Sequence, residues 1–219
     1  MRIKAVLFDM DGVLVDGKEW HYEALNTALR KTSLGVIKKE NHIKIFDGLP
    51  TKKKLDIYSE TTPLTKYQKE KVYALKQEET RNLIKKYCKK NNIHVELMNF
   101  LKKENIRTAC WSNAIRTTME EMLSRSELLS YMEFLISNED VEKPKPSPEI
   151  YLKAINKMGI KADEVLICED NINGIKAAID SKSWVLPIRK ISDVNTYNIK
   201  KAIKKIENNE TDTKLINNN

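Results

Sequence analysis

The chain opens with an apolar run that stops abruptly at two acids. Residues 6–8 are apolar, and Asp9, Asp11 and Gly12 follow them. A short apolar run with β-branched and aromatic members that ends at a turn residue is typical of a buried strand. Runs of the same kind predict four further strands, at residues 106–111, 134–137, 165–168 and 184–188.

A long helical region separates the first two predicted strands. No alternating strand pattern interrupts residues 18 to about 90, and the spacing of Thr65 and Gln68 predicts a capping box at the start of a polar helix over 67–87. One apolar helix face in this region consists of Trp20, Ala24, Leu25, Ala28 and Leu29. Later helices are predicted near residues 96–104, 115–124, 147–158, 171–181 and 196–206. In the helix over 171–181, the residues expected to face inward are Ile172, Ile175, Ala178 and Ile179.

Strands that alternate with helices predict the fold class α/β, with a Rossmann-like parallel sheet. The predicted core consists of residues 1–16 and 96–206, and an α-helical domain of residues 17–95 is inserted after the first strand. The remaining residues, 207–219, are polar and are expected to fray. A chain of 219 residues can bury one good core and a smaller second lobe.

The composition narrows the classes of partner. The 39 basic and 31 acidic residues give a net charge of +8, which could indicate nucleic acid. The lysines are scattered along predicted helices without interleaved aromatic residues, so a solvated surface is the favoured reading and nucleic-acid binding is disfavoured. A positive field would also attract small phosphorylated metabolites.

The sequence carries no sign of a membrane span, a signal peptide or a disulfide framework. No segment approaches 18 apolar residues, and the first apolar run is too short and too early for a signal peptide. Cys88, Cys110 and Cys168 are odd in number and widely spaced, which favours neither disulfides nor a zinc site. A cytoplasmic monomer is therefore expected.

Polar residues follow several predicted strands at the point where each strand ends. In open α/β sheets, ligands bind outside the carboxyl ends of the strands. Each segment alone also fits a plain structural role: a polar strand end, a helix N-cap or acids that favour a helix dipole. The residues at these positions are Asp9, Asp11, Ser112, Asn113, Lys143, Lys145, Glu169 and Asp170.

These residues lie in four segments, 6–13, 110–113, 143–149 and 166–171. Taken together and in this order, the four segments resemble the four motifs of the haloacid dehalogenase superfamily, in its branch of small phosphatases and β-phosphoglucomutase-like enzymes. The match is near-exact at residues 8–13 and 145–151. The resemblance implies that the helical insertion is a mobile cap that closes over an active site, with hinges near residues 15–18 and 91–96. Gly17 departs from the more frequent threonine or serine, so the hinge and proton relay need not follow the family pattern.

The resemblance also implies roles in catalysis. Asp9 would be the nucleophile and Asp11 the general acid and base, while Ser112 would help to cradle the phosphoryl group. Lys145 fits the motif in register and is preferred as the catalytic lysine, with Lys143 as the alternative.

Acids that converge at neighbouring strand ends repel one another, so a cation is expected among them. A ligand set made only of oxygen atoms favours Mg²⁺. The expected metal ligands are Asp9, Asp11, Glu169 and Asp170.

Substrate contacts are expected in both parts of the chain. His21 matches a histidine that relatives with this cap place near the substrate, and residues 47–51 occupy the place of the family's specificity loop. Read without the family, the histidine is a surface residue and the loop a simple turn. The expected substrate-binding residues are His21, Asp47, Gly48, Thr51, Ser112 and Asn113.

The predicted function is a Mg²⁺-dependent phosphatase that hydrolyses a small phosphomonoester, such as a sugar phosphate or a three-carbon alcohol phosphate, through an aspartyl-phosphate. The alternative is a phosphomutase, which must grip a second phosphate. The places where related mutases carry that grip hold Ala114, Ile115 and Thr51, but Arg116 and Lys52 lie one residue away and keep the alternative open. A non-catalytic phosphate-binding protein is less favoured, because the motif residues are all present.

Overall fold

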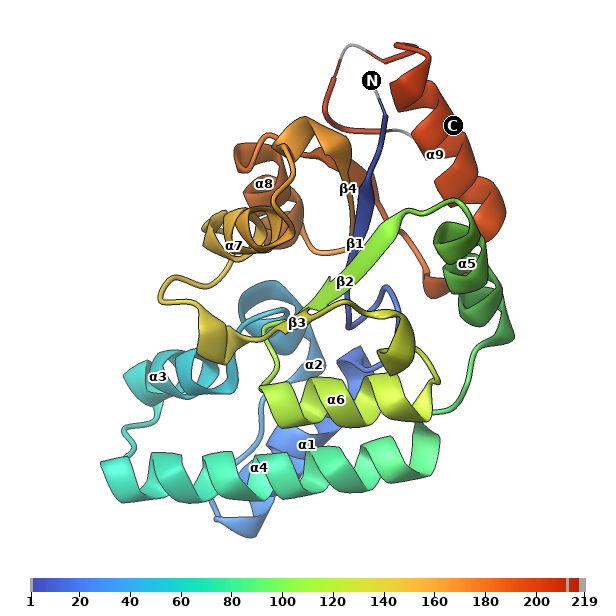
Figure 1. Ribbon diagram of the computed structural model, residues 1–219. Helices are drawn as coiled ribbons and strands as arrows, with labels where there is room; N and C mark the ends of the chain where they lie inside the picture. Colours follow the sequence, from blue (N-terminus) through green and yellow to red (C-terminus); the bar gives the residue numbers. More distant parts are fainter. Residues whose placement is uncertain (1, 212, 217–219) are drawn as a thin grey trace. The chain divides into compact units, whose positions relative to one another are not determined.

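The computed structural model describes residues 2–211 and 213–216, and it contains one parallel sheet of five strands (Figure 1). The strand order is β3-β2-β1-β4-β5, which confirms the predicted α/β class. The strands are β1 (Ala5–Asp9), β2 (Arg107–Trp111), β3 (Leu135–Ile136), β4 (Val165–Glu169) and β5 (Trp184–Pro187).

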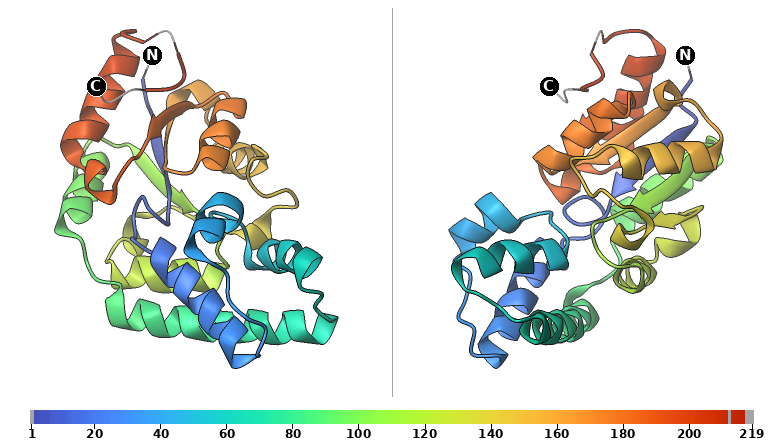
Figure 2. Two further views of the ribbon diagram at one scale, coloured as in Figure 1. Left: turned by 180° about the vertical axis from the view of Figure 1, so that it is seen from behind. Right: turned by 90° about the vertical axis from the view of Figure 1, so that its left-hand side faces the viewer.

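Helices cover both faces of the sheet, with α5 and α9 on one side and α7 and α8 on the other (Figures 1 and 2). Every residue of β1 is buried. Because helices cover both faces of the sheet, such a strand has to be apolar along most of its length, which explains the apolar run before Asp9. The α-helices are α5 (Asn92–Lys103), α6 (Arg116–Arg125), α7 (Glu149–Met158), α8 (Ile172–Asp180) and α9 (Thr196–Glu207). Short 3₁₀ helices are η2 (Leu129–Tyr131), η3 (Asn138–Asp140), η4 (Ala162–Glu164) and η5 (Ile191–Asp193).

Residues 17–88 form a separate helical bundle around a small core of their own. Helix α1 packs on α4, and α3 also contacts α4. The predicted capping box is confirmed: the Gln68 amide donates to Thr65 Oγ1 at 3.2 Å, and the Thr65 amide donates to Gln68 Oε1 at 2.8 Å. The elements are α1 (Lys18–Lys31), α2 (Lys39–Asn41), the π-helix η1 (His42–Phe46), α3 (Thr51–Thr61) and α4 (Lys66–Tyr87). Its core consists of Leu25, Ala28, Leu29, Ile37, Phe46, Leu55 and Val72.

The chain divides into two compact units, the core unit of residues 1–16 and 89–219 and the helical unit of residues 17–88. The second junction therefore lies after residue 88, whereas the sequence prediction places it after residue 95. Helix α5 begins at Asn92 and contacts β2, so a boundary at residue 95 would cut through a continuous helix. The role of the helical unit as a cap stays a prediction.

Residues 213–216 pack against the sheet, which the polar composition does not predict. The Val185 amide donates to the carbonyl of Lys214 at 2.8 Å, and the Ile216 amide donates to the carbonyl of Val185 at 2.7 Å. Ile216 is buried. The expectation of fraying is wrong for residues 213–216, because the edge strand β5 offers unpaired backbone groups that this segment satisfies. Residues 212 and 217–219 lie outside the described residues.

Helix α8 turns inward only part of the face that the sequence predicts. Ala178 is buried and Ile175 packs against the core, as predicted, whereas Ile172 is 75% exposed and Ile179 is 37% exposed. Gly174 and Ala177 are buried in their place. Small residues on the inner face allow the helix to lie close to the end of β4. In the described part of the chain, no helix is long and apolar enough to cross a membrane.

Candidate active site

Two acids lie at the carboxyl edge of the sheet, where the strand order reverses. Asp9 ends β1 and Glu169 ends β4, and these strands are neighbours. The carboxyl edge at such a switch point is where open α/β sheets bind ligands. Both side chains are buried, so their charges need compensation from nearby groups.

Lys145 supplies part of that compensation. Its Nζ donates to Asp9 Oδ1 at 2.5 Å and to Glu169 Oε2 at 2.7 Å, and the lysine is 7% exposed. The Lys145–Pro146 peptide bond is cis. Lys143 is exposed, and its backbone amide donates to Glu149 Oε2 at 2.9 Å. Of the two candidate lysines, Lys145 is therefore the one that contacts the acids.

The local charge remains negative even with Lys145 present. Burial, followed by the charge of Glu169, raises the pKa of Asp9 well above its ordinary value, although Lys145 opposes the shift. Burial lowers the pKa of Lys145, but the carboxylates of Asp9 and Glu169 outweigh burial and hold that pKa above its ordinary value. Asp170 adds a further negative charge beside Asp9. One lysine does not balance the charge of three acids, so a bound cation would be favourable at this place.

The donor set fits a hard divalent cation. One carboxylate oxygen from each of Asp9, Glu169 and Asp170 lies within 4.8 Å of the others. Oxygen ligands of this kind suit Mg²⁺, which typically keeps several waters and takes one or two carboxylates. The fourth predicted ligand, Asp11, is not part of that group; its Oδ2 instead accepts from Ser112 Oγ at 3.3 Å.

Ser112 follows β2 and is buried beside the first acid motif. Its Oγ donates to Asp11 Oδ2 at 3.3 Å and accepts from the Ala114 amide at 3.0 Å. Helix α6 has Ile115 at its N-cap without a side-chain bond, so Ser112 is not the cap of that helix. The carbonyl of Asn113 accepts from Asn138 Nδ2 at 2.8 Å, which ties the loop after β2 to the loop after β3.

The predicted substrate residues of the helical unit have contacts within that unit. His21 lies in α1, and its Nδ1 is 3.2 Å from Lys76 Nζ. Asp47 and Gly48 form the turn before α3, with Asp47 Oδ2 3.8 Å from Lys18 Nζ. Thr51 is the first residue of α3 and is buried. Their roles in substrate binding stay predictions.

Sequence reasoning missed the burial of two lysines in the helical unit. Lys54 and Lys76 are each 6% exposed, although the run of lysines that includes Lys54 reads as a solvated surface. Lys54 Nζ lies 3.5 Å from His42 Nε2. Burial and the charge of Lys54 lower the pKa of His42 from 6.5 to about 4. Helical spacing from Thr51 and Leu55 is the one signal that could have revealed Lys54 in advance.

Arg116 is one of the two residues that left a phosphomutase as an alternative, and its side chain forms an ion pair with Asp140. Its guanidinium donates to Asp140 Oδ2 at 2.5 Å and to the carbonyl of Leu135 at 3.3 Å. Asp140 also accepts from Ser137, so this arginine joins the loops after β2 and β3. Lys52 is exposed, with its Nζ 5.8 Å from the centre of the Tyr73 ring.

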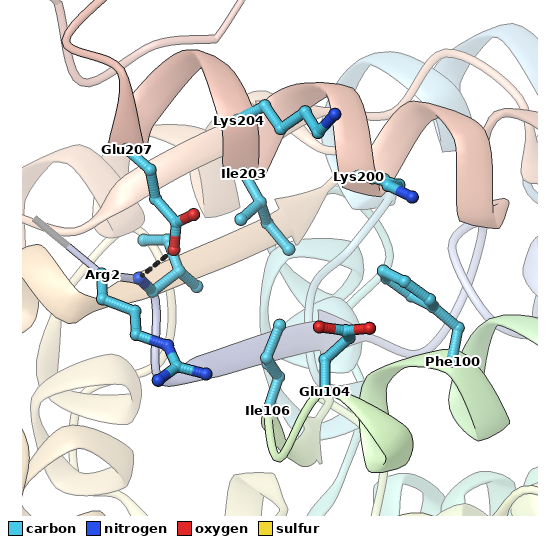
Figure 3. Close-up of a pocket in the computed structure, with 9 residues that line it drawn as sticks. Arg2, Phe100, Glu104, Ile106, Lys200, Ile203, Lys204 and Glu207 are labelled. Carbon is cyan, nitrogen blue, oxygen red and sulfur yellow. Dashed lines mark hydrogen bonds between the residues drawn. The ribbon is translucent and has the colours of Figure 1, made fainter.

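A cavity of about 200 Å³ lies at the opposite, amino end of the core unit (Figure 3). Basic, acidic and apolar side chains all line it, and Glu207 Oε1 accepts from the backbone amide of Ile3 at 3.0 Å. Of the lining residues, Ile3 precedes β1 and Ile106 precedes β2, so the cavity lies at the end of the sheet opposite the acids that end β1 and β4. The lining residues are Arg2, Ile3, Phe100, Glu104, Ile106, Lys200, Ile203, Lys204 and Glu207.

The order of motifs and the geometry at the sheet edge are those of one enzyme family. The family model for haloacid dehalogenase-like hydrolases matches residues 6–186, and the chain belongs to this family. The predicted family is thereby confirmed.

Similar proteins include phosphatases. The phosphorylated carbohydrates phosphatase of Thermotoga maritima is 28% identical over 176 residues, which cover 80% of this chain and 80% of that protein. The pyrophosphatase PpaX of Bacillus cereus (strain AH820) is 26% identical over 177 residues, which cover 80% of this chain and 78% of that protein. The predicted class of enzyme, a phosphoric monoester hydrolase, is confirmed.

Two solved structures show the same fold. β-Phosphoglucomutase of Clostridium difficile has a TM-score of 0.80 at 19% identity and covers 95% of this chain and 99% of its own. CbbY of Rhodobacter sphaeroides, in complex with xylulose-(1,5)bisphosphate, has a TM-score of 0.78 at 19% identity. The match covers 84% of this chain and 85% of that one. These likenesses support the fold, and the substrate has to be argued from the site.

Proposed function

We propose that the chain is a Mg²⁺-dependent phosphatase that hydrolyses a small phosphomonoester, either a sugar phosphate or a three-carbon alcohol phosphate, through an aspartyl-phosphate. The observation that carries the proposal is the buried contact of Lys145 with Asp9, beside Glu169 and Asp170, at the sheet edge. A nucleophilic carboxylate, a cation and further acids within one small volume suit phosphoryl transfer, in which charge stabilisation and positioning supply most of the catalysis.

In the first half-reaction, an oxygen of Asp9 attacks the phosphorus atom in line with the bond to the alcohol oxygen. The new bond gives an aspartyl-phosphate, and the old bond breaks with its electron pair on the leaving oxygen. Asp11 donates the proton that this oxygen needs. Lys145 holds the attacking carboxylate in place through its bond to Asp9 Oδ1.

In the second half-reaction, water attacks the phosphorus atom of the aspartyl-phosphate. Asp11 takes the proton that it gave away in the first step, now from water, and Asp9 leaves as a carboxylate. The Ser112 hydroxyl donates to Asp11 Oδ2, which orients this acid between the two steps. Ser112 and Asn113 lie at the end of β2 and would bind phosphate oxygens.

Mg²⁺ would be held by Asp9 and Asp170, with Glu169 beside them, and when bound it supplies positive charge to the transferring phosphoryl oxygens. The three acids need such a charge before an anionic phosphate can approach. Substrate selection is assigned to the helical unit, through His21, Asp47, Gly48 and Thr51. A small phosphorylated metabolite is the proposed partner, in a monomer located in the cytoplasm. The three cysteines are buried and are not joined by disulfides, which is in keeping with a reducing compartment.

The alternative, a phosphomutase, has weaker support. A mutase must hold a second phosphate while a bisphosphate intermediate turns over, and water must be excluded meanwhile. Arg116 is the nearest cation after the motif serine, and its guanidinium is bound to Asp140. Binding a distal phosphate would require that ion pair to break.

The test is a panel of phosphomonoesters incubated with and without Mg²⁺, with release of inorganic phosphate as the readout. We expect turnover of at least one small sugar or three-carbon alcohol phosphate, and loss of turnover when the metal is chelated. Metal-independent turnover, or no turnover of any monoester, would contradict the proposal.

A second assay separates the phosphatase from the mutase. The enzyme is incubated with β-glucose 1-phosphate, with and without the 1,6-bisphosphate, and glucose 6-phosphate and free phosphate are measured separately. We expect hydrolysis without any need for the bisphosphate. Isomerisation that depends on the bisphosphate and exceeds hydrolysis would favour the mutase and would give Arg116 and Lys52 a role in substrate binding.

A further inference from the structure

The carboxylate of Glu169 accepts four hydrogen bonds, two on each oxygen. Lys145 Nζ donates to Oε2 at 2.7 Å, and the Tyr151 hydroxyl donates to the same oxygen at 2.6 Å. The backbone amides of Asp170 and Asn171 donate to Oε1 at 3.2 and 3.1 Å. An ionised carboxylate offers about four lone-pair positions, so these donors use all of them.

A metal ligand needs a lone pair that points at the ion. Glu169 would have to give up a bond to Lys145, Tyr151 or a backbone amide before it could bind Mg²⁺ directly. Since the side chain is fully buried, a donor left behind would lose its partner in a place without water, which typically costs about 1 to 3 kcal/mol. The proximity of Glu169 to Asp9 and Asp170 is therefore not sufficient to make it a ligand.

Gly174 shows that the carboxylate has little freedom to move. A Cβ atom at this position would lie 2.1 Å from Cδ and 2.2 Å from Oε2 of Glu169, closer than real atoms approach. The first turn of α8 therefore lies directly against the carboxylate. The inward face of this helix follows from that close approach, which explains why Gly174 rather than Ile172 faces the sheet.

Tyr151 is built to donate to this one carboxylate. It lies in α7, and its ring packs edge to face on Trp111 with 4.3 Å between the ring centres. Burial, followed by the charge of Glu169, raises the pKa of the Tyr151 hydroxyl, so the hydroxyl keeps its proton. Lys145 Nζ lies 5.8 Å from the centre of the Tyr151 ring and 6.0 Å from that of Trp111. Both ring faces favour a cation at that place.

We propose that Glu169 and Tyr151 are positioning residues for Lys145, and that Glu169 is not a direct ligand of Mg²⁺. Tyr151 and two backbone amides hold the carboxylate, the carboxylate holds the lysine, and the lysine holds Asp9 in the orientation for attack. The metal is then carried by Asp9 and Asp170. This inference rests on the proposed function for its kinetic readout, whereas its metal readout needs only the substrate-free protein.

The first test is Tyr151→Phe, which removes the hydroxyl and keeps the ring. We expect kcat for the best monoester of the panel to fall about tenfold or more, the effect typical of losing a partner that orients a site residue, with KM and Mg²⁺ affinity nearly unchanged. The matched control is Tyr131→Phe, whose hydroxyl donates to Asn99 Oδ1 at 2.9 Å outside the site. An unchanged kcat in a folded Tyr151→Phe protein would overturn the positioning role.

The second test compares Mg²⁺ binding to Glu169→Gln and Asp170→Asn by calorimetry without substrate. We expect Asp170→Asn to weaken binding at least about a hundredfold and Glu169→Gln to weaken it no more than about tenfold, since only the first removes a ligand. Circular dichroism and a thermal melt check that each variant is folded. Equal losses in the two folded variants would show that Glu169 binds the metal and would overturn the proposal. A wild-type protein that binds Mg²⁺ but hydrolyses no monoester would contradict the proposed function and leave the calorimetric test valid.

Discussion

Both units of the molecule bury lysine side chains, but the neighbours of those lysines differ. In the core unit, Lys145 donates to the carboxylates of Asp9 and Glu169. In the helical unit, Lys54 and Lys76 lie beside histidine nitrogens, at 3.5 and 3.2 Å. All three lysines are 6 to 7% exposed. Burial alone therefore says little about what a lysine does.

Burial and the neighbouring charges together set the protonation states of these groups. Beside two acids, the pKa of Lys145 is held above its ordinary value despite burial, so the lysine is a permanent counter-ion. Burial, followed by the charge of Lys54, lowers the pKa of His42 to about 4, so that histidine is neutral at pH 7 and can accept a bond from the ammonium group. The core unit thus uses Lys145 to balance charge, whereas in the helical unit Lys54 lies beside a neutral His42 ring.

The largest expected effect is the loss of turnover when Asp9, the acid that Lys145 contacts, is substituted. Asp9→Asn removes the nucleophile, and at saturating Mg²⁺ we expect kcat to fall on the order of a thousandfold or more while the fold is kept; since Asp9 is also a proposed metal ligand, Mg²⁺ affinity should fall as well. Phosphate release is the measurement, with circular dichroism and calorimetry as controls. Near-normal turnover in this variant would rule out the aspartyl-phosphate mechanism.

Lys145→Met should abolish most activity and also destabilise the protein. Removing one partner of a buried ion pair leaves uncompensated charge and costs about 3 to 5 kcal/mol of unfolding free energy. Urea unfolding and phosphate release are the measurements. Lys143→Met, two residues away and exposed, is the matched control and should change neither by more than about 0.5 kcal/mol or twofold. Equal effects of the two substitutions would contradict the role of Lys145 as the counter-ion of the buried acids.

A smaller effect is expected when the histidine of the helical unit is titrated. His42 has a pKa of about 4 in the folded protein and an ordinary value of 6.5, so the unfolded chain takes up the proton first as pH falls. The stabilising contribution is complete above pH 6.5 and is lost between pH 6.5 and 4. With allowance for screening, we expect about 1 to 2 kcal/mol from this residue.

Urea unfolding at pH 7 and pH 4.5 measures this loss. In His42→Asn, the part of the pH dependence that belongs to the histidine should be absent, while the contribution of His94, whose pKa is also lowered by burial, stays the same in both proteins. An identical pH dependence in the two proteins would show that His42 is not held neutral.

The smallest effect is expected from Lys54→Met, read out on the histidine itself. The charge of Lys54 is the second cause, after burial, of the low pKa of His42. Its removal should raise that pKa by up to about one unit, toward 6.5, as followed by NMR of the imidazole ring. Lys53→Met, an exposed neighbour in α3, is the control and should leave the pKa in place. No shift in the Lys54→Met protein would assign the low value to burial alone.

The sequence alone was enough to locate the strands and the chemistry at their ends. Each strand of a doubly covered sheet must be apolar along most of its length, so the runs before Asp9, Ser112 and Glu169 stand out in a single chain. The motifs after them lie at one edge because parallel strands share a direction. The family and the class of enzyme follow from that order.

The tertiary structure decided what no local pattern contains. The contact of Lys145 with the acids and the hydroxyl of Tyr151 on Glu169 join residues distant in the chain, and the space that Gly174 leaves for that carboxylate depends on how α8 packs at the end of β4. The sequence prediction also failed at Ile172 and Ile179 of α8, which are exposed, and at residues 214–216, which pair with β5 instead of fraying. Helix periodicity and composition describe how a segment could be buried, whereas the partner that buries it comes from another part of the chain.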